Sequence, residues 1–179
     1  MPQTRMRDVP VLETERLIMR GFDRANFPNF AALLADPIVV KHIGGKPVSR
    51  EDAWRKYMSL DGSWNLLGFG AWDVFERNSG TYVGYVGFSE FLRQTVPSID
   101  GRPEIGWVLA LEAQGKGYAT EAAKAAMAWG LPRFNGARPV CLIEPNYPAT
   151  YRVAEKCGYV KHALTKYNGL DMLLMEYPA

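Results

Sequence analysis

The sequence predicts a mixed α/β domain in which helices cover the faces of one central sheet. The chain has 179 residues, which is the size of a single domain. Hydrophobic residues make up 47% of it, and 8 Phe, 9 Tyr and 5 Trp are enough to fill a core. Segments with strand alternation are interspersed with segments that have helical spacing, which predicts the order β α α β β β α β α β β.

The N-terminal half is predicted to supply an arm, one strand and two helices. Residues 1–10 carry two prolines and several charges and are expected to form a loose arm, so that residues 11–179 make up the single domain. Alternation over residues 12–20 predicts a strand with Leu17 and Met19 on one face. Helical spacing follows over residues 23–35, and a capping box beginning at Ser49 predicts a second helix that ends near Ser59.

The remaining elements follow from alternation, short apolar runs and turn residues. A hairpin is predicted from two alternating segments, residues 69–76 and 81–91, because a turn cluster separates them. The expected elements after it are a central strand over 104–110, a glycine loop over 114–119, a helix over 118–129, a strand over 139–143, a helix over 150–156 and a final strand pair over 160–166 and 172–177.

Composition excludes several classes of protein. With 21 basic and 19 acidic residues the net charge is +2, too balanced for a dedicated nucleic-acid binder. Cys141 and Cys157, with only two histidines, are too few for a disulfide scaffold or a structural zinc site, so we expect no metal. His42 and His162 have no partners at ligand spacing and are expected to be structural or solvent-facing. The chain has neither an apolar run long enough to span a membrane nor a secretory N-terminal pattern, which predicts a cytoplasmic protein without membrane contact.

The segment with the clearest chemical signal is the glycine loop between a strand and a helix. Gly115 and Gly117 allow the backbone to bend so that successive N–H groups point outward at a helix start, and Lys116 adds positive charge. Such donors, together with the helix dipole, form a site for phosphate or pyrophosphate.

Three phosphate motifs compete for this loop. The Walker motif has no match in the chain. The dinucleotide fingerprint is incomplete, because residues 115–120 end in Thr120 and an antiparallel hairpin precedes them. The third motif, [QR]xxGx[GA], is matched in full by Gln-Gly-Lys-Gly-Tyr-Ala at residues 114–119.

Four blocks of the chain together resemble the GNAT N-acetyltransferase superfamily, in the branch of the ribosomal-protein N-terminal acetyltransferases. The blocks are the opening strand at residues 12–20, the fourth strand at 104–109, the loop at 114–121 and the last helix with its turn at 152–159. They occur in the family's order, which is more specific than any one motif. The resemblance implies a mostly antiparallel sheet with helices on both faces and a splay between the fourth and fifth strands.

The resemblance also implies acetyl-CoA as cosubstrate and an amine as acceptor. In the family the pantetheine arm pairs with the fourth strand, an N–H near Val108 or Leu109 stabilises the oxyanion, and the pyrophosphate binds the N–H groups of the loop. The residues implied to bind acetyl-CoA are Trp107, Val108, Leu109, Ala110, Gln114, Gly115, Lys116, Gly117, Tyr118, Ala119, Thr120, Asn146 and Thr150.

One position departs from the family pattern. The family's usual Asn stands three residues before the Ser or Thr that starts the last helix, and in this chain that position is Tyr147, whereas Asn146 lies one residue earlier. Either Tyr147 replaces the Asn contact or the loop is shifted. The candidate catalytic residues are Glu104, as a base that works through water, and Tyr151, as a general acid.

Two other functions remain open from the residues. A dinucleotide-binding oxidoreductase would use the same loop, with Glu144 on the ribose, and a non-catalytic acyl-CoA-binding protein would bind CoA without transfer. The sequence leaves the acceptor open: a protein N-terminus, lysine, polyamine, aminoglycoside or other small amine. The final strand pair is a candidate edge for a homodimer.

Overall fold

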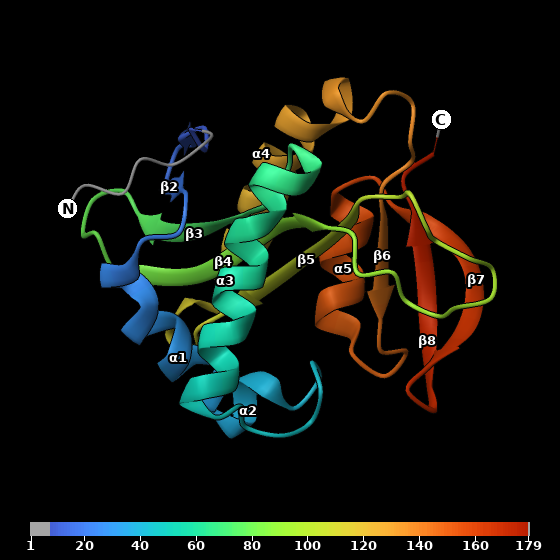
Figure 1. The fold of residues 1–179 in the computed structure, drawn as a ribbon, viewed down its shortest axis with the longest axis horizontal. Helices are drawn as coiled ribbons and strands as arrows, with labels where there is room; N and C mark the ends of the chain where they lie inside the picture. The colour runs from blue at the N-terminus through green and yellow to red at the C-terminus, as the bar shows by residue number, and fades with distance from the viewer. Residues whose placement is uncertain (1–7, 179) are drawn as a thin grey trace.

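A computed structural model describes residues 8–178 and has one eight-stranded sheet in the order β1-β2-β3-β4-β5-β6-β8-β7 (Figure 1). Every neighbouring pair is antiparallel except β5 and β6. The strands are β1 (Leu12–Glu13), β2 (Leu17–Arg20), β3 (Ala71–Glu76), β4 (Tyr82–Ser89), β5 (Glu104–Leu109), β6 (Val140–Ile143), β7 (Val160–Tyr167) and β8 (Leu170–Glu176). The helices are α1 (Phe27–Ala35), α2 (Pro37–Val40), α3 (Arg50–Leu67), α4 (Tyr118–Gly130) and α5 (Pro148–Lys156).

The predicted opening strand is divided in two. A turn closes at Thr14, whose N–H donates to the Leu17 carbonyl at 3.0 Å, and β1 then pairs antiparallel with β2. Leu17 and Met19 are fully buried, as the alternation predicted. Residues 1–7 of the predicted arm lie outside the described residues; within the rest of it, the Pro10 carbonyl accepts a hydrogen bond from the Trp72 indole.

The second predicted helix, α3, is longer than expected. The Ser49 hydroxyl caps it by accepting the Asp52 N–H at 3.1 Å, as the capping box predicted. The helix passes Ser59 because Leu60 and Trp64 continue its buried face, and it ends where Gly68 takes a left-handed conformation with φ of 79°. None of the described helices is both long and apolar enough to cross a membrane.

Side chains that alternate along β5 divide the core between the two faces of the sheet. Val108 packs with residues of α1 and α3, whereas Ile105 and Leu109 pack with residues of α4. Because successive strand residues point to opposite faces, α1 and α3 cover one face and α4 covers the other, as Figure 1 also shows. The segment of residues 90–103 lies over β6 and β8, where Ile99 packs on Val140 and Leu174.

The sheet opens between β5 and β6, as the resemblance implied for the fourth and fifth predicted strands. The two parallel strands meet at Glu104 and Val140, where the Val140 N–H donates to the Pro103 carbonyl at 2.9 Å. Beyond this pair the described strands share no further ladder position. The result is a V-shaped gap that is closed at the Glu104 end and open toward the ends of both strands.

The register of β4 and β5 decides which backbone groups face this gap. The Ala110 N–H donates to the Val83 carbonyl at 2.9 Å, and Tyr85 is opposite Val108. Hydrogen-bonded pairs alternate along an antiparallel ladder, so the backbone groups of Val108 and Ala110 face β4. Those of Trp107 and Leu109 therefore point into the gap.

Candidate active site

The predicted glycine loop joins the open end of β5 to the start of α4. Gly115 and Gly117 have φ angles of 75° and 82°, in the left-handed region that favours glycine. A Cβ built on Gly115 would have no neighbour within 4 Å. The loop therefore leaves open space beside a backbone that only glycine adopts without strain.

The start of α4 presents a row of free backbone donors. The helical bonding begins with the Glu121 N–H, which donates to the Gly117 carbonyl at 3.1 Å. In the described part of the chain, no backbone or side-chain acceptor takes the N–H groups of residues 115–120. These orphan donors lie at the positive end of a 13-residue helix, an arrangement that can bind an anion, and the anion site itself stays a prediction.

Hydrogen bonds to Glu121, in the first turn of α4, connect the glycine loop to the β1–β2 turn. The Glu121 carboxylate accepts the Thr14 hydroxyl at 2.6 Å and the Arg16 N–H at 2.9 Å, and the Arg16 guanidinium donates to it at 2.7 Å. The same guanidinium also donates to the Lys116 carbonyl at 2.9 Å. Burial opposes ionisation of Glu121, but these donors outweigh it and lower the pKa of its carboxyl. Residue spacing could not predict this contact, because the partners are about a hundred positions apart.

Neutralising this anchor is expected to destabilise the protein in a pH-dependent way. A carboxyl whose pKa is lowered by folding stabilises the protein above its ordinary pKa, about 4.3, and that contribution is lost as the pH falls through the folded-state pKa. The variant Glu121→Gln should therefore melt about 3 °C lower at pH 7, and the difference should shrink below pH 4. Melting curves at both pH values check this, and an unchanged difference between them would show that Glu121 stabilises the loop only by packing.

The edge of β5 and the loop are linked by Gln114, the first residue of the matched motif. Its side-chain amide donates to the Leu109 carbonyl at 3.0 Å. Of the two N–H groups predicted near the oxyanion, that of Val108 belongs to the ladder with β4, which leaves Leu109 as the donor that faces the gap. The free edge of β5 thus consists of the backbone groups of Trp107 and the N–H of Leu109, shortly before the glycine loop.

Glu104 lies at the closed end of the gap and is paired with a residue that the sequence did not suggest. Arg93 donates to both carboxylate oxygens, at 2.7 and 2.9 Å, and the Glu104 side chain is 8% exposed. The guanidinium also lies against the rings of Phe91 and Tyr167. Burial raises the pKa of Glu104, and the Arg93 pair opposes that shift. The role of Glu104 as a base stays a prediction, with the new constraint that each of its oxygens accepts a hydrogen bond from Arg93.

Three residues gather at the open end of the gap. The Glu144 carboxylate, just after β6, lies 2.5 Å from Nδ1 of His42, in the segment after α2. The imidazole stacks on the Tyr147 ring at 4.1 Å between centroids. His42 therefore has a specific partner, and Tyr147, at the position of the family's usual Asn, stands at the start of α5 without a side-chain cap. Asn146 and Thr150 flank it, and their side chains make no hydrogen bond within the described residues.

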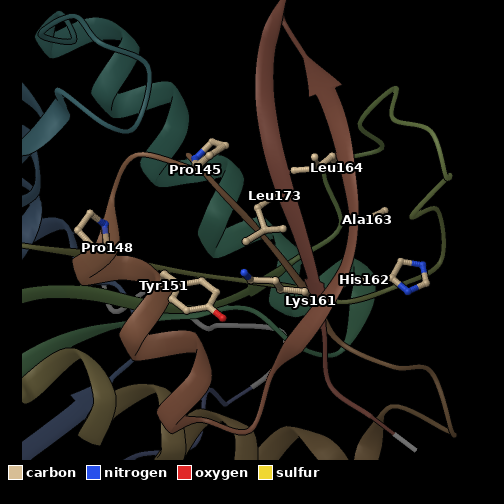
Figure 2. A pocket seen from close by; sticks show the side chains of 8 residues that line it. All are labelled: Pro145, Pro148, Tyr151, Lys161, His162, Ala163, Leu164 and Leu173. Atoms are coloured by element: carbon tan, nitrogen blue, oxygen red, sulfur yellow. The ribbon is translucent and has the colours of Figure 1, made fainter.

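Tyr151 lies away from Glu104 and the loop. It points into a shallow groove of about 520 Å³ between α5 and the β7–β8 pair, where Lys161 Nζ lies 5.1 Å from the centre of its ring (Figure 2). A hydrogen bond with Glu155 raises the pKa of the Tyr151 phenol. The structure does not bring Tyr151 to the edge of β5, and its role as a general acid stays a prediction.

No three His, Cys, Asp or Glu side chains gather as a metal site within residues 8–178. His162, the second histidine, lies 3.3 Å from Glu176 on the β8 strand, far along the sheet from the loop.

Known acetyltransferases are similar to this chain over most of its length. The family model of the acetyltransferase (GNAT) domain matches residues 16–160. Two curated relatives come from Bacillus subtilis (strain 168): the protein YkkB is 30% identical over 88% of this chain and 90% of its own length, and the N-acetyltransferase YnaD is 27% identical over 87% and 85%. Both are described as uncharacterized.

Solved structures share the fold over nearly the whole chain. A putative GNAT-family acetyltransferase from Bordetella pertussis has a TM-score of 0.84 and 27% identity, with coverage of 95% of this chain and all of the other. A ribosomal L7/L12 alpha-N-protein acetyltransferase in complex with coenzyme A has a TM-score of 0.73 and 16% identity over 93% and 97%. At that identity the second likeness concerns the fold alone.

The chain belongs to the GNAT acetyltransferase family. The resemblance inferred from the four sequence blocks is thereby confirmed, as are the mixed sheet and the enzyme class of N-acetyltransferase.

Proposed function

We propose that the protein transfers an acetyl group from acetyl-CoA to a primary amine by direct attack in a ternary complex. The observation that carries the proposal is the row of free N–H donors at residues 115–120, beside a free strand edge at Trp107 and Leu109. When bound, acetyl-CoA supplies the thioester that donates the acetyl group. The residues proposed to hold it are Trp107, Val108 and Leu109 on β5, Ala110 directly after it, Gln114 to Thr120 in the loop and the start of α4, and Asn146 and Thr150 at α5.

Each part of this site has a distinct task. The N–H groups at the start of α4 and the Lys116 ammonium neutralise the pyrophosphate, because anions are favoured at a helix N-terminus. The free Trp107 and Leu109 edge binds the pantetheine amides as a neighbouring strand would. The Leu109 N–H is the donor available to an oxyanion at the reacting carbonyl.

The thiols are proposed to take no covalent part in the reaction. Burial raises the pKa of Cys141 well above its usual range and that of Cys157 to about 11, so neither is a thiolate near neutral pH. The double variant Cys141→Ala, Cys157→Ala should keep most of its turnover, apart from a packing loss. Mass spectrometry of the wild type during turnover checks the same point, and an acetyl group mapped to either thiol would contradict direct attack.

A binding comparison separates acetyl-CoA from the nucleotide alternative. In an oxidoreductase Glu144 would bind a ribose, but here its carboxylate is engaged by His42 at 2.5 Å. We expect acetyl-CoA to raise the melting temperature and NAD to leave it unchanged. Stabilisation by NAD and not by acetyl-CoA would favour the oxidoreductase.

The acceptor is proposed to be either a protein N-terminus or a small-molecule amine. Both the loop and the free strand edge come from one chain, so the proposal does not require the predicted homodimer. A screen of thiol release from acetyl-CoA across peptides, polyamines, aminoglycosides and lysine tests the acceptor class. Binding of acetyl-CoA without thiol release for any amine would instead identify a non-catalytic acyl-CoA-binding protein.

A further inference from the structure

The open end of the gap between β5 and β6 is bridged by the pair of His42 and Glu144. His42 belongs to the segment that follows α2, on the half of the molecule that carries α1 and α3. Glu144 belongs to the connection from β6 to α5, on the other half. Figure 1 shows the segment after α2 reaching toward the end of β6, and the 2.5 Å contact confirms that the two connections meet.

Along the direction of the strands, Glu144 lies as far from the closed end of the gap as the free edge of β5 does. The parallel strands β5 and β6 are in register at Glu104 and Val140. Val108 follows Glu104 by four positions, and Glu144 follows Val140 by four, so both are about 13 Å from the closed end. The carboxylate of Glu144 is therefore level with the part of β5 where the thioester is proposed to lie, whereas Glu104 is a whole strand length away.

The geometry of the pair is that of a histidine poised to accept a proton. A carboxylate oxygen can only accept a hydrogen bond, so the contact places the proton of the neutral imidazole on Nδ1. Nε2 then carries the lone pair. The Tyr147 ring, stacked at 4.1 Å and inclined by 18°, holds the plane of the imidazole. The His42 side chain is 24% exposed, so the imidazole is partly open to solvent.

Glu104 is less suited to this step than its strand position suggested. Both of its oxygens accept hydrogen bonds from Arg93, and the carboxylate is almost fully buried. Protonation would neutralise the carboxylate and so weaken two charge-assisted bonds that stabilise its ionised form. The His42 imidazole has a free acceptor atom and gives up nothing.

We propose that His42 is the group that accepts the proton of the acceptor ammonium, and that Glu144 positions it. The inference depends on the proposed acetyl transfer. The ammonium gives one proton to Nε2, and the neutral amine forms a C–N bond with the thioester carbon. The C–S bond breaks, and the departing thiolate takes a second proton from the amine nitrogen. The imidazolium then returns its proton to water.

The test compares two substitutions of the same type. The His42→Gln side chain can still donate to Glu144 but cannot accept a proton, and His162→Gln alters the other histidine–carboxylate contact, on β7. With acetyl-CoA and the amine that gives the fastest thiol release, His42→Gln should lower kcat by about a hundredfold at pH 7. The acidic limb of its pH–rate profile should vanish, while the acetyl-CoA affinity changes less than about twofold. His162→Gln should match the wild type.

Glu144 and the imidazole itself provide independent readouts. The Glu144→Leu variant removes the acceptor of the Nδ1 proton, so it should lower kcat while leaving the acetyl-CoA affinity unchanged. The Tyr147 phenol is the other titratable group in contact with the ring, so Tyr147→Phe, which keeps the stacking, should leave the acidic limb in place. NMR of the protein without ligands, with signals assigned by means of His162→Gln, should show neutral His42 protonated on Nδ1.

Three results would overturn the proposal. One is an acidic limb that persists in His42→Gln with kcat within about threefold of the wild type. Another is the loss of that limb in Glu104→Gln instead, which would make Glu104 the proton acceptor. The third is a neutral His42 protonated on Nε2. If the wild type turns over no amine, acetyl transfer itself fails, and the NMR tautomer still reports separately on the geometry of the pair.

Discussion

Replacing Gly117 by valine is expected to weaken acetyl-CoA binding by about a hundredfold. The residue has a φ of 82°, which a β-branched side chain rarely adopts, and its Cβ would lie 3.4 Å from the Arg16 guanidinium. The substitution therefore turns the donors of residues 118–120 away from the phosphates and displaces the Arg16 anchor. Loss of two charge-assisted hydrogen bonds corresponds to about 3 kcal/mol, or roughly a hundredfold in affinity.

A matched control separates backbone strain from the loss of the anion site. Gly136, between α4 and β6, has nearly the same φ of 83°, and a Cβ there would have no neighbour within 4 Å. Gly136→Val should therefore impose similar strain and leave the acetyl-CoA affinity unchanged. Isothermal titration of both variants, with melting curves to confirm folding, makes the comparison. Undiminished affinity in a folded Gly117→Val variant would show that the loop is not the acetyl-CoA site.

Removing Arg93 is expected to destabilise the protein by about 3 kcal/mol at pH 8, because it leaves a buried carboxylate without its partner. Burial raises the pKa of Glu104 even beside Arg93, so without that cation it should rise further. A folded-state pKa above the ordinary value means that the ionised form is disfavoured by folding. The stability deficit of Arg93→Leu should therefore be largest at high pH and should shrink as the pH falls toward 5.

The double variant Arg93→Leu, Glu104→Leu tests the cause of this deficit. With both charges removed, most of the lost stability should return, since two apolar side chains can replace a buried ion pair at little cost. Urea unfolding of the single and double variants at pH 5 and pH 8 gives the required free energies. A deficit of equal size at both pH values would show that Arg93 stabilises the fold through Phe91 and Tyr167 rather than through Glu104.

The elements with a strong periodic pattern were predicted well from the sequence. The hairpin of β3 and β4, the central strand β5 and helix α4 lie within two residues or so of their predicted ends, because alternation and glycine or proline breaks are local signals. The division of residues 12–20 into two strands was not predicted, since it follows from a turn at Thr14 that pairs β1 with β2. The C-terminal half of α3 was missed because Gly62 weakens its helical pattern.

The conformation of the loop in the candidate active site was predictable for the same reason, but the contacts around the loop were not. Gln114, Gly115 and Gly117 form a contiguous motif whose backbone geometry follows from glycine. The pair of Arg93 and Glu104 is separated by 11 positions of the chain. The separation is 105 positions for Arg16 and Glu121, and 102 for His42 and Glu144. Only the folded chain brings these charges together, so residue spacing gave no sign of them.

Acetylation of an amine is the most direct test of the proposed acetyl transfer. The protein is incubated with acetyl-CoA and a panel of primary amines, and mass spectrometry records both the acetylated amine and the free CoA. We predict that at least one amine gains a single acetyl group in equal amount to the CoA released. At subsaturating acetyl-CoA, Gly117→Val should lower both rates about a hundredfold, while Gly136→Val should not. Binding of acetyl-CoA without acetylation of any amine in the panel would contradict the proposed transfer.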